Sequence, residues 1–220
     1  MRRFGKLAAL VFLAVLLSGC GQVVPETQTI EESTLVISAD GRLTAYLVGV
    51  FDKSYYDLDE LAAMAQEEAI EFGGSEDDAP VKMESFETEA VSGGTRVVVT
   101  YTFDSAASYE GFIEDTLFFG TVEEALLQGY GSDVTLLNVK DGTLLTEGEL
   151  SQNQEKHLVV FSPKPMELSQ EQGGEKQLVI LCPWRVGFLS EGASLDQEDG
   201  VRISWTEGSG YDPVYILLSR

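Results

Sequence analysis

Few side chains in this 220-residue chain can act as nucleophiles or as nitrogen and sulfur ligands of a metal. The chain has one histidine, His157, and two cysteines, Cys20 and Cys182. A single histidine excludes every site that needs two, including zinc sites of the His-Glu-x-x-His type. The Gly-x-Ser-x-Gly nucleophile turn and the phosphate-binding Gly-x4-Gly-Lys-Ser/Thr loop are both missing from the sequence. We therefore predict no catalytic residue and no cofactor.

Cys182 and His157 form the only nucleophilic dyad that the composition allows. Cys182 ends the apolar run 178–181 and is followed by Pro183, which lacks the backbone N–H that an oxyanion hole would use. A buried, inert thiol is the favoured interpretation of Cys182. His157 opens an apolar stretch, and we expect it to be structural.

Carboxylates are the most numerous charged side chains, with 37 Asp and Glu against 14 Lys and Arg. Two acidic segments, 76–78 and 196–200, have the oxygen ligands that calcium prefers. Neither matches an EF-hand loop, because the glycine of the second segment, Gly200, comes one place early. We predict solvated turns and no metal site, and Asp196, Glu198 and Asp199 are the residues with which to test calcium binding.

Large aromatic side chains offer a second kind of binding chemistry. Trp184, Trp205 and Tyr211 have flat apolar faces with a polar edge, which suit sugar rings or a protein partner. Packing in the core is the favoured role for each, and a binding platform is the alternative. A glycosidase with paired carboxylates also fits the composition, although so many acids give that pattern no specificity.

The N-terminus carries an export signal. Eleven consecutive apolar residues, 7–17, follow Arg2, Arg3 and Lys6. This run is too short to cross a bilayer as a helix, but it has the length of a signal-peptide core.

The end of that run, Leu16-Leu17-Ser18-Gly19-Cys20, resembles the bacterial lipobox. The resemblance implies that residues 1–19 are a signal peptide, that cleavage falls before Cys20, and that Cys20 carries a diacylglyceryl thioether. We therefore expect a protein anchored by lipid to the extracytoplasmic face of the cell membrane. An ordinary secretory signal with a chance cysteine is the alternative.

The expected mature chain is strongly acidic. Its 201 residues include 11 Lys and Arg and 37 Asp and Glu, which gives a net charge of −26. Phosphate repels such a surface, so nucleic acid and anionic lipid head groups are excluded as general partners. Residues 20–33 lack a sustained period and read as an acidic tether. Cys182 is then the only thiol outside the anchor, so no internal disulfide is available.

Turn and helix signals organise residues 34–220. We predict hairpins at the glycines of 40–41, 93–94 and 141–142, the first as a type I′ turn, with a bulge near residues 85–86. Helices are expected from Asp57 to the Gly73-Gly74 pair, over 105–113, and from Thr121 to about Gly129. The first of them has Leu58, Leu61, Ala62, Ala65, Ala69 and Phe72 on one face.

The second half lacks helical signals. Strands are expected at 157–161, 177–182, 201–205 and 214–218, separated by polar and acidic loops. The whole predicts an α+β domain of mostly antiparallel sheet built from hairpins, with two or three amphipathic helices in the first half and a β-rich second half. A weak domain boundary is possible at 147–156. The apolar strand 214–218 should complete the core.

Three segments of the mature chain resemble uncharacterised surface lipoproteins of gut Firmicutes: 51–61 (FDKSYYDLDEL), 119–125 (FGTVEEA) and 139–142 (VKDG). The resemblance implies a location and no catalytic residue. We expect a membrane-anchored, non-catalytic binding or interaction module whose partner is a protein or a glycan. The alternatives are a carboxylate-based glycan hydrolase and a small-ligand receptor for a transporter.

Overall fold

The computed structural model describes residues 30–53, 55–75, 77–164, 175–206 and 212–219. The expected signal peptide, Cys20 and most of the expected tether lie outside the described residues, as does Tyr211.

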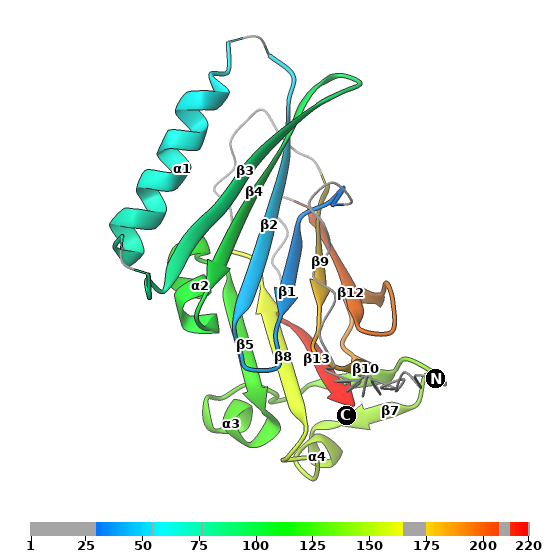
Figure 1. Cartoon of the computed structure of the whole chain (residues 1–220). Coiled ribbons are helices and arrows are strands. Elements are labelled where there is room, and N and C mark those ends of the chain that lie inside the picture. Colours follow the sequence, from blue (N-terminus) through cyan, green and yellow to red (C-terminus); the bar gives the residue numbers. More distant parts are fainter. Residues whose placement is uncertain (1–29, 54, 76, 165–174, 207–211, 220) are drawn as a thin grey trace, which may run out of the picture.

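Two β-sheets form the framework of the described chain (Figure 1). In spatial order, the strands of the seven-stranded sheet are β11 (Ala193–Leu195), β12 (Gly200–Thr206), β9 (Glu175–Leu181), β1 (Thr34–Ile37), β2 (Leu43–Phe51), β4 (Gly94–Phe103) and β3 (Val81–Val91). Those of the six-stranded sheet are β5 (Thr116–Thr121), β8 (His157–Ser162), β13 (Val214–Ser219), β10 (Arg185–Leu189), β6 (Thr135–Asn138) and β7 (Leu144–Thr146). Among these strands, neighbours are antiparallel except for β1 and β9, which are parallel.

The predicted α+β class is wrong, because strands hold 46% of the described residues and helices only 20%. The sequence reading missed β5, β10 and β11, which are short and lack a clean alternation of apolar and polar residues. Strands therefore run through both halves of the chain. A short helix, α4 (Glu147–Leu150), also lies in the half that was expected to have none.

Two of the three other described helices begin after the predicted caps, Asp57 and Thr121, and the third begins one residue after its predicted start at Ser105. They are α1 (Leu58–Gly73), α2 (Ala106–Ile113) and α3 (Val122–Leu127). The Asp57 carboxylate accepts hydrogen bonds from the backbone N–H groups of residues 59 and 60, both at 3.1 Å. The side chain of Thr121 and that of Glu124 form the predicted capping box. Local hydrogen-bond chemistry therefore fixed these helix starts.

The first hairpin has a different turn from the predicted type I′. Gly41 has a φ of 86°, but Asp40 is not among the described residues with positive φ. The Gly41 N–H donates to the Ser38 carbonyl at 3.0 Å, as in a type I turn closed by a left-handed glycine. The predicted bulge in β3 falls one residue earlier, between Met83 and Ser85.

The main core lies between the two sheets. Leu35 of β1 and Ile203 of β12 belong to the same buried cluster as Phe161 of β8 and Ile216 of β13. The Phe161 and Trp205 ring centroids are 6.4 Å apart, which joins the two layers directly. A second cluster covers the other face of the six-stranded sheet, where Val122 and Ala125 of α3 and Leu150 of α4 pack.

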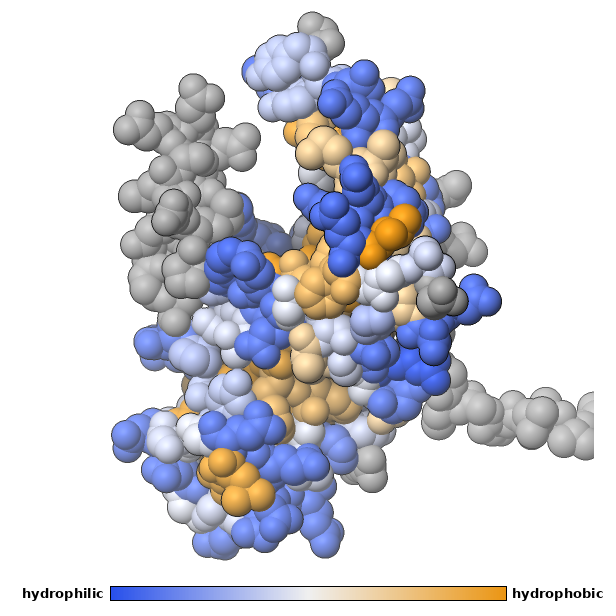
Figure 2. Space-filling view, turned by 90° about the vertical axis from the view of Figure 1, so that its left-hand side faces the viewer, coloured by the Kyte–Doolittle hydropathy of each residue, from blue (hydrophilic) through white to orange (hydrophobic). Residues whose placement is uncertain are grey.

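Helix α1 lies beside the seven-stranded sheet and buries only Ala65 and Ala69. Met64, Ile70 and Phe72 stay 51%, 42% and 45% exposed, so Phe72 is less buried than the predicted apolar face requires. Figure 2 looks onto the α1 side and shows apolar side chains interspersed with hydrophilic ones. None of the described helices has both the length and the apolar character needed to cross a bilayer.

Strands from both sides of residues 147–156 pair with each other in both sheets. Strand β5 precedes this segment and pairs with β8, which follows it. Strand β1 likewise pairs with β9.

Strand β13 lies between β8 and β10, and its Ile216, Leu217 and Leu218 are at most 1% exposed. The last strand therefore completes the core of the six-stranded sheet.

Candidate functional site

The two tryptophans proposed for a platform are half-buried and pack against the main core. The Trp184 ring lies 4.6 Å from that of His157, edge to face, and 6.1 Å from that of Phe119. Trp205 packs near Phe161, in the layer between the sheets. The structure therefore uses both rings for packing and does not bring them together on one exposed surface.

Cys182 is fully buried, as the sequence predicts. Burial, together with the charge of Asp199, raises the pKa of its thiol far above the ordinary value, so the reactive thiolate is suppressed at neutral pH. Its backbone N–H donates to the Asp199 carbonyl at 2.8 Å. His157 lies in the aromatic cluster with Phe119 and Trp184.

The acidic residues of segment 196–200 do not converge on a common centre. Asp196 pairs with Arg202 at 2.9 Å, whereas Glu198 pairs with Arg185 at 2.7 Å. Within the described part of the chain, no three His, Cys, Asp or Glu side chains lie close enough together to hold a metal ion. Two of the three candidate calcium ligands, Asp196 and Glu198, are therefore paired with separate arginines, and no arginine pair is seen for the third, Asp199, among the described residues.

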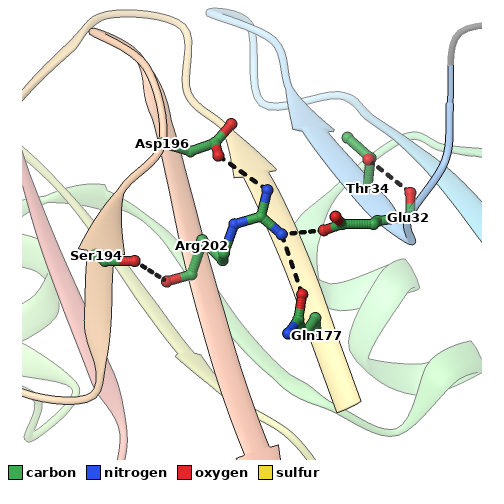
Figure 3. Close-up of polar contacts among 6 residues, drawn as sticks. All are labelled: Glu32, Thr34, Gln177, Ser194, Asp196 and Arg202. Carbon is green, nitrogen blue, oxygen red and sulfur yellow. Dashed lines mark hydrogen bonds and ion pairs between the residues drawn. The ribbon is translucent and has the colours of Figure 1, made fainter. Parts of the chain in front are cut away.

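Arg202 is the centre of a polar cluster on the seven-stranded sheet (Figure 3). Its guanidinium donates to Asp196, to the Gln177 amide oxygen at 3.2 Å and to Glu32, which precedes β1. Hydrogen bonds to the two carboxylates raise the pKa of the Arg202 guanidinium. The cluster links β12, β9 and the chain that leads into β1, so its role is structural.

Arg185 lines a cavity of about 330 Å³ that we call the β10 pocket. Both sheets contribute to it, because β6, β10 and β13 belong to one sheet and Leu195 to the other. Strand β10 lies at the lower right of Figure 1, near β7 and below β12. The pocket is lined by Asn138, Val139, Lys140, Arg185, Val186, Gly187, Phe188, Leu195, Glu198 and Ser219.

A β-bulge shapes the wall of the β10 pocket. The pairing of β10 with β13 shifts between Val186 and Phe188, which leaves Gly187 as the extra residue. A Cβ at Gly187 would overlap the Ser219 hydroxyl, so glycine lets the two strands approach closely. Bulges of this kind occur frequently beside functional sites, where they redirect side chains.

Two backbone contacts hold the other walls. The Val139 N–H donates to the Gly187 carbonyl at 3.0 Å, which fixes the β6–β7 turn against β10. The Val186 N–H donates to the Glu198 carbonyl at 2.9 Å, which fixes the loop of the other sheet. The pocket is therefore formed by hydrogen-bonded backbone and not by side chains alone.

The polar groups at the pocket differ in how firmly they are held. The Arg185 and Glu198 side chains are 65% and 74% exposed, so their ion pair lies in solvent. Lys140 is exposed, and its ammonium has no ion-pair or hydrogen-bond partner among the described residues. The pocket thus combines exposed charges with an apolar wall formed by Val139 and Leu195.

Comparison with known proteins returned no match. No family model, no curated protein and no solved structure is significantly similar to the chain. The argument about function therefore rests on the residues themselves.

A second hollow, of about 540 Å³, lies beside the β1–β2 hairpin, and we call it the acidic hollow. Its carboxylates are Asp77, Asp78, Glu84 and Asp104, so it contains part of the acidic segment 76–78. Glu84 accepts a hydrogen bond from Thr102 at 2.8 Å, and Asp104 accepts one from Ser105, also at 2.8 Å. Two of its four acids are therefore held by neighbouring hydroxyls.

The sequence reading missed Lys140, Arg185 and the whole β10 pocket. One signal was present, because Gly187 interrupts an apolar stretch that otherwise reads as a strand, and an isolated glycine there indicates a bulge. Long-range strand pairing, which has no local signal in the sequence, brings together residues 138–140, 185–188 and 195–198.

Proposed function

We propose that the protein is a lipid-anchored binding module on the extracytoplasmic face of a bacterial membrane, with the β10 pocket as its ligand site. The basic start, the apolar run and the small residues before Cys20 support the anchor. The β10 pocket supports the binding role, because its volume reaches the range of small-ligand sites and it combines apolar walls with a few charged groups.

The anchor is tested by replacing Cys20 in the full chain. Cys20→Ala should abolish labelling with a radioactive fatty acid and release the protein from the membrane fraction. Cys182→Ala is the matched control, because it removes the other cysteine and leaves the acylation site intact. Normal acylation and membrane retention of Cys20→Ala would contradict the anchor.

The ligand site is tested by thermal melts of the full chain against a panel of small metabolites, glycans and calcium. A compound present at a hundred times its dissociation constant should add about 2.7 kcal/mol to the free energy of unfolding. Leu195→Trp, which narrows the β10 pocket, should remove that shift. Leu127→Trp on α3 is the control, because Leu127 is 82% exposed and does not line the pocket.

A carboxylate-based glycan hydrolase is the second candidate, and the acidic hollow is the observation that favours it. Glycosidases use two carboxylates across the scissile bond, and this hollow is lined by four. The β10 pocket is lined by one, Glu198. Release of reducing sugar from a neutral glycan, lost in Asp78→Asn, would establish this activity, and no turnover by the unaltered chain would reject it.

A further inference from the structure

Two basic side chains, Lys140 and Arg185, line the β10 pocket in a chain whose net charge is strongly negative. The one carboxylate of the lining, Glu198, is already paired with Arg185. The charge that remains without a partner at the pocket is therefore the Lys140 ammonium, which favours an anionic ligand.

The ion pair between Arg185 and Glu198 is easy to open. Both side chains are more than half exposed, and exposed pairs of this kind contribute little to stability. The pair joins Nη2 of Arg185 and Oε2 of Glu198 at 2.7 Å. A ligand carboxylate that accepted two parallel hydrogen bonds from the guanidinium would compete with Glu198 for Arg185.

The rest of the pocket is apolar. Val139 and Leu195 line it, and Leu195 is 43% exposed although it faces this cavity. The ring of Phe188 packs with the second core cluster, on the other face of the six-stranded sheet. A ligand with an apolar body would cover Val139 and Leu195, which a simple inorganic anion would leave in water.

We infer that the β10 pocket binds a small organic carboxylate, whose carboxylate group displaces Glu198 from Arg185 and whose apolar body packs against Val139 and Leu195. Lys140 supplies the second positive charge. The inference rests on the proposed function, because it requires the β10 pocket to be a ligand site.

The test uses a matched pair of probes and the full chain in nanodiscs of phosphatidylcholine, a lipid without net charge. The probes are para-fluorophenylacetate and its neutral amide, para-fluorophenylacetamide, and fluorine NMR follows their binding. The carboxylate should bind at least about tenfold more tightly than the amide, as expected for one additional charge-assisted interaction. Nanodiscs without protein give the background.

Substitutions at the ion pair should act in opposite directions. Arg185→Gln should bring the affinities of the two probes close to each other, because the guanidinium is lost. Glu198→Gln should tighten binding of the carboxylate by about threefold, because the competing anion is removed, and should leave the amide unchanged. Lys140→Gln should weaken binding of the carboxylate by about threefold.

Arg42 and Asp40 provide the matched control. They form a similarly exposed ion pair, with Arg42 Nε and Asp40 Oδ2 3.1 Å apart, and neither lines the β10 pocket. Arg42→Gln and Asp40→Asn should leave binding of both probes unchanged.

Three results would overturn the inference: equal binding of the two probes, no binding of either, or a preference for the carboxylate that survives Arg185→Gln. The proposed function is judged separately by the thermal melts. A stabilising compound that depends on Leu195 would keep the β10 pocket as a ligand site even if the carboxylate probe failed. The absence of any such compound would reject both proposals.

Discussion

Arg202 and Arg185 pair with acids that lie two residues apart in one loop, yet their surroundings differ. Arg202 is 30% exposed and donates to two carboxylates and an amide, which belong to three segments of the chain. Arg185 is 65% exposed and has Glu198 as its ion-pair partner. The comparison teaches that an arginine shared by several segments holds the fold together, whereas an arginine in an exposed pair beside a pocket stays available to a ligand.

The largest expected effect is on the backbone that presents Arg185. Gly187→Ala should lower the free energy of unfolding by about 1.5 kcal/mol, because the new methyl group forces the Ser219 hydroxyl into another rotamer and lies only 3.3 Å from the Leu217 carbonyl oxygen. Urea denaturation measures the loss. Adding Ser219→Ala should restore part of it.

Gly148→Ala is the control for that substitution, because a Cβ at Gly148 in α4 meets no atom within 4 Å. It should leave stability unchanged or increase it, since alanine favours the helix. Equal losses of unfolding free energy in Gly187→Ala and Gly148→Ala would show that the bulge tolerates a side chain at residue 187.

Arg202→Ala comes next in size. It should lower the free energy of unfolding by about 1 kcal/mol, because Glu32 and Asp196 lose a shared partner. A double-mutant cycle of Arg202→Ala with Asp196→Ala should give a clear coupling energy. A double-mutant cycle for Arg185 and Glu198 should give a smaller coupling energy. Equal coupling energies would contradict the distinction between a structural Arg202 and an available Arg185.

The charge of Glu124 stabilises the start of α3, where this side chain forms the capping box with Thr121. Hydrogen bonds from the backbone N–H of Thr121, and then from its hydroxyl, lower the pKa of Glu124. A lowered folded-state pKa stabilises the protein above the unfolded value and loses that effect as the pH falls through the folded value. Glu124→Gln should therefore be less stable than the parent chain at pH 7, and thermal melts should show the difference closing as the pH falls below about 4.5.

The smallest effect is expected at Arg185 itself. Arg185→Ala should change the free energy of unfolding by less than about 0.5 kcal/mol, because the residue is exposed and its ion pair is weak. Urea denaturation beside Arg202→Ala checks this. A loss as large as that of Arg202→Ala would make the Arg185 pair structural and would remove it from the argument about binding.

Local chemistry in the sequence predicted individual elements well. The caps at Asp57 and Thr121 and the hairpins at Gly41 and Gly142 act over a few residues, and the structure has them. The fold class failed because β5, β10 and β11 carry no period that distinguishes them from loops. Neither the parallel pairing of β1 with β9 nor the layering of the two sheets has a local signal.

The candidate site was harder to predict for the same reason. The aromatic character of Trp184 and Trp205 suggested a binding role, but both pack against the core. Lys140 and Arg185 look like ordinary surface charges in the sequence. Their common position depends on β6 pairing with β10 and on the loop before Gly200 reaching across from the other sheet. Spacing along the chain does not carry that information.

The parallel pair of β1 and β9 sets the order in which the chain can fold. Strand β1 ends at Ile37, but its neighbour β9 begins at Glu175, and β13, in the middle of the other sheet, ends at Ser219. The β1–β2 hairpin can form early, but the edge of β1 that pairs with β9 is covered only after nearly the whole chain has been made. Folding should therefore be slow, because contacts between distant residues dominate it. Slow closure of the two sheets would suit the proposed export, since a chain crosses a narrow channel before it has folded.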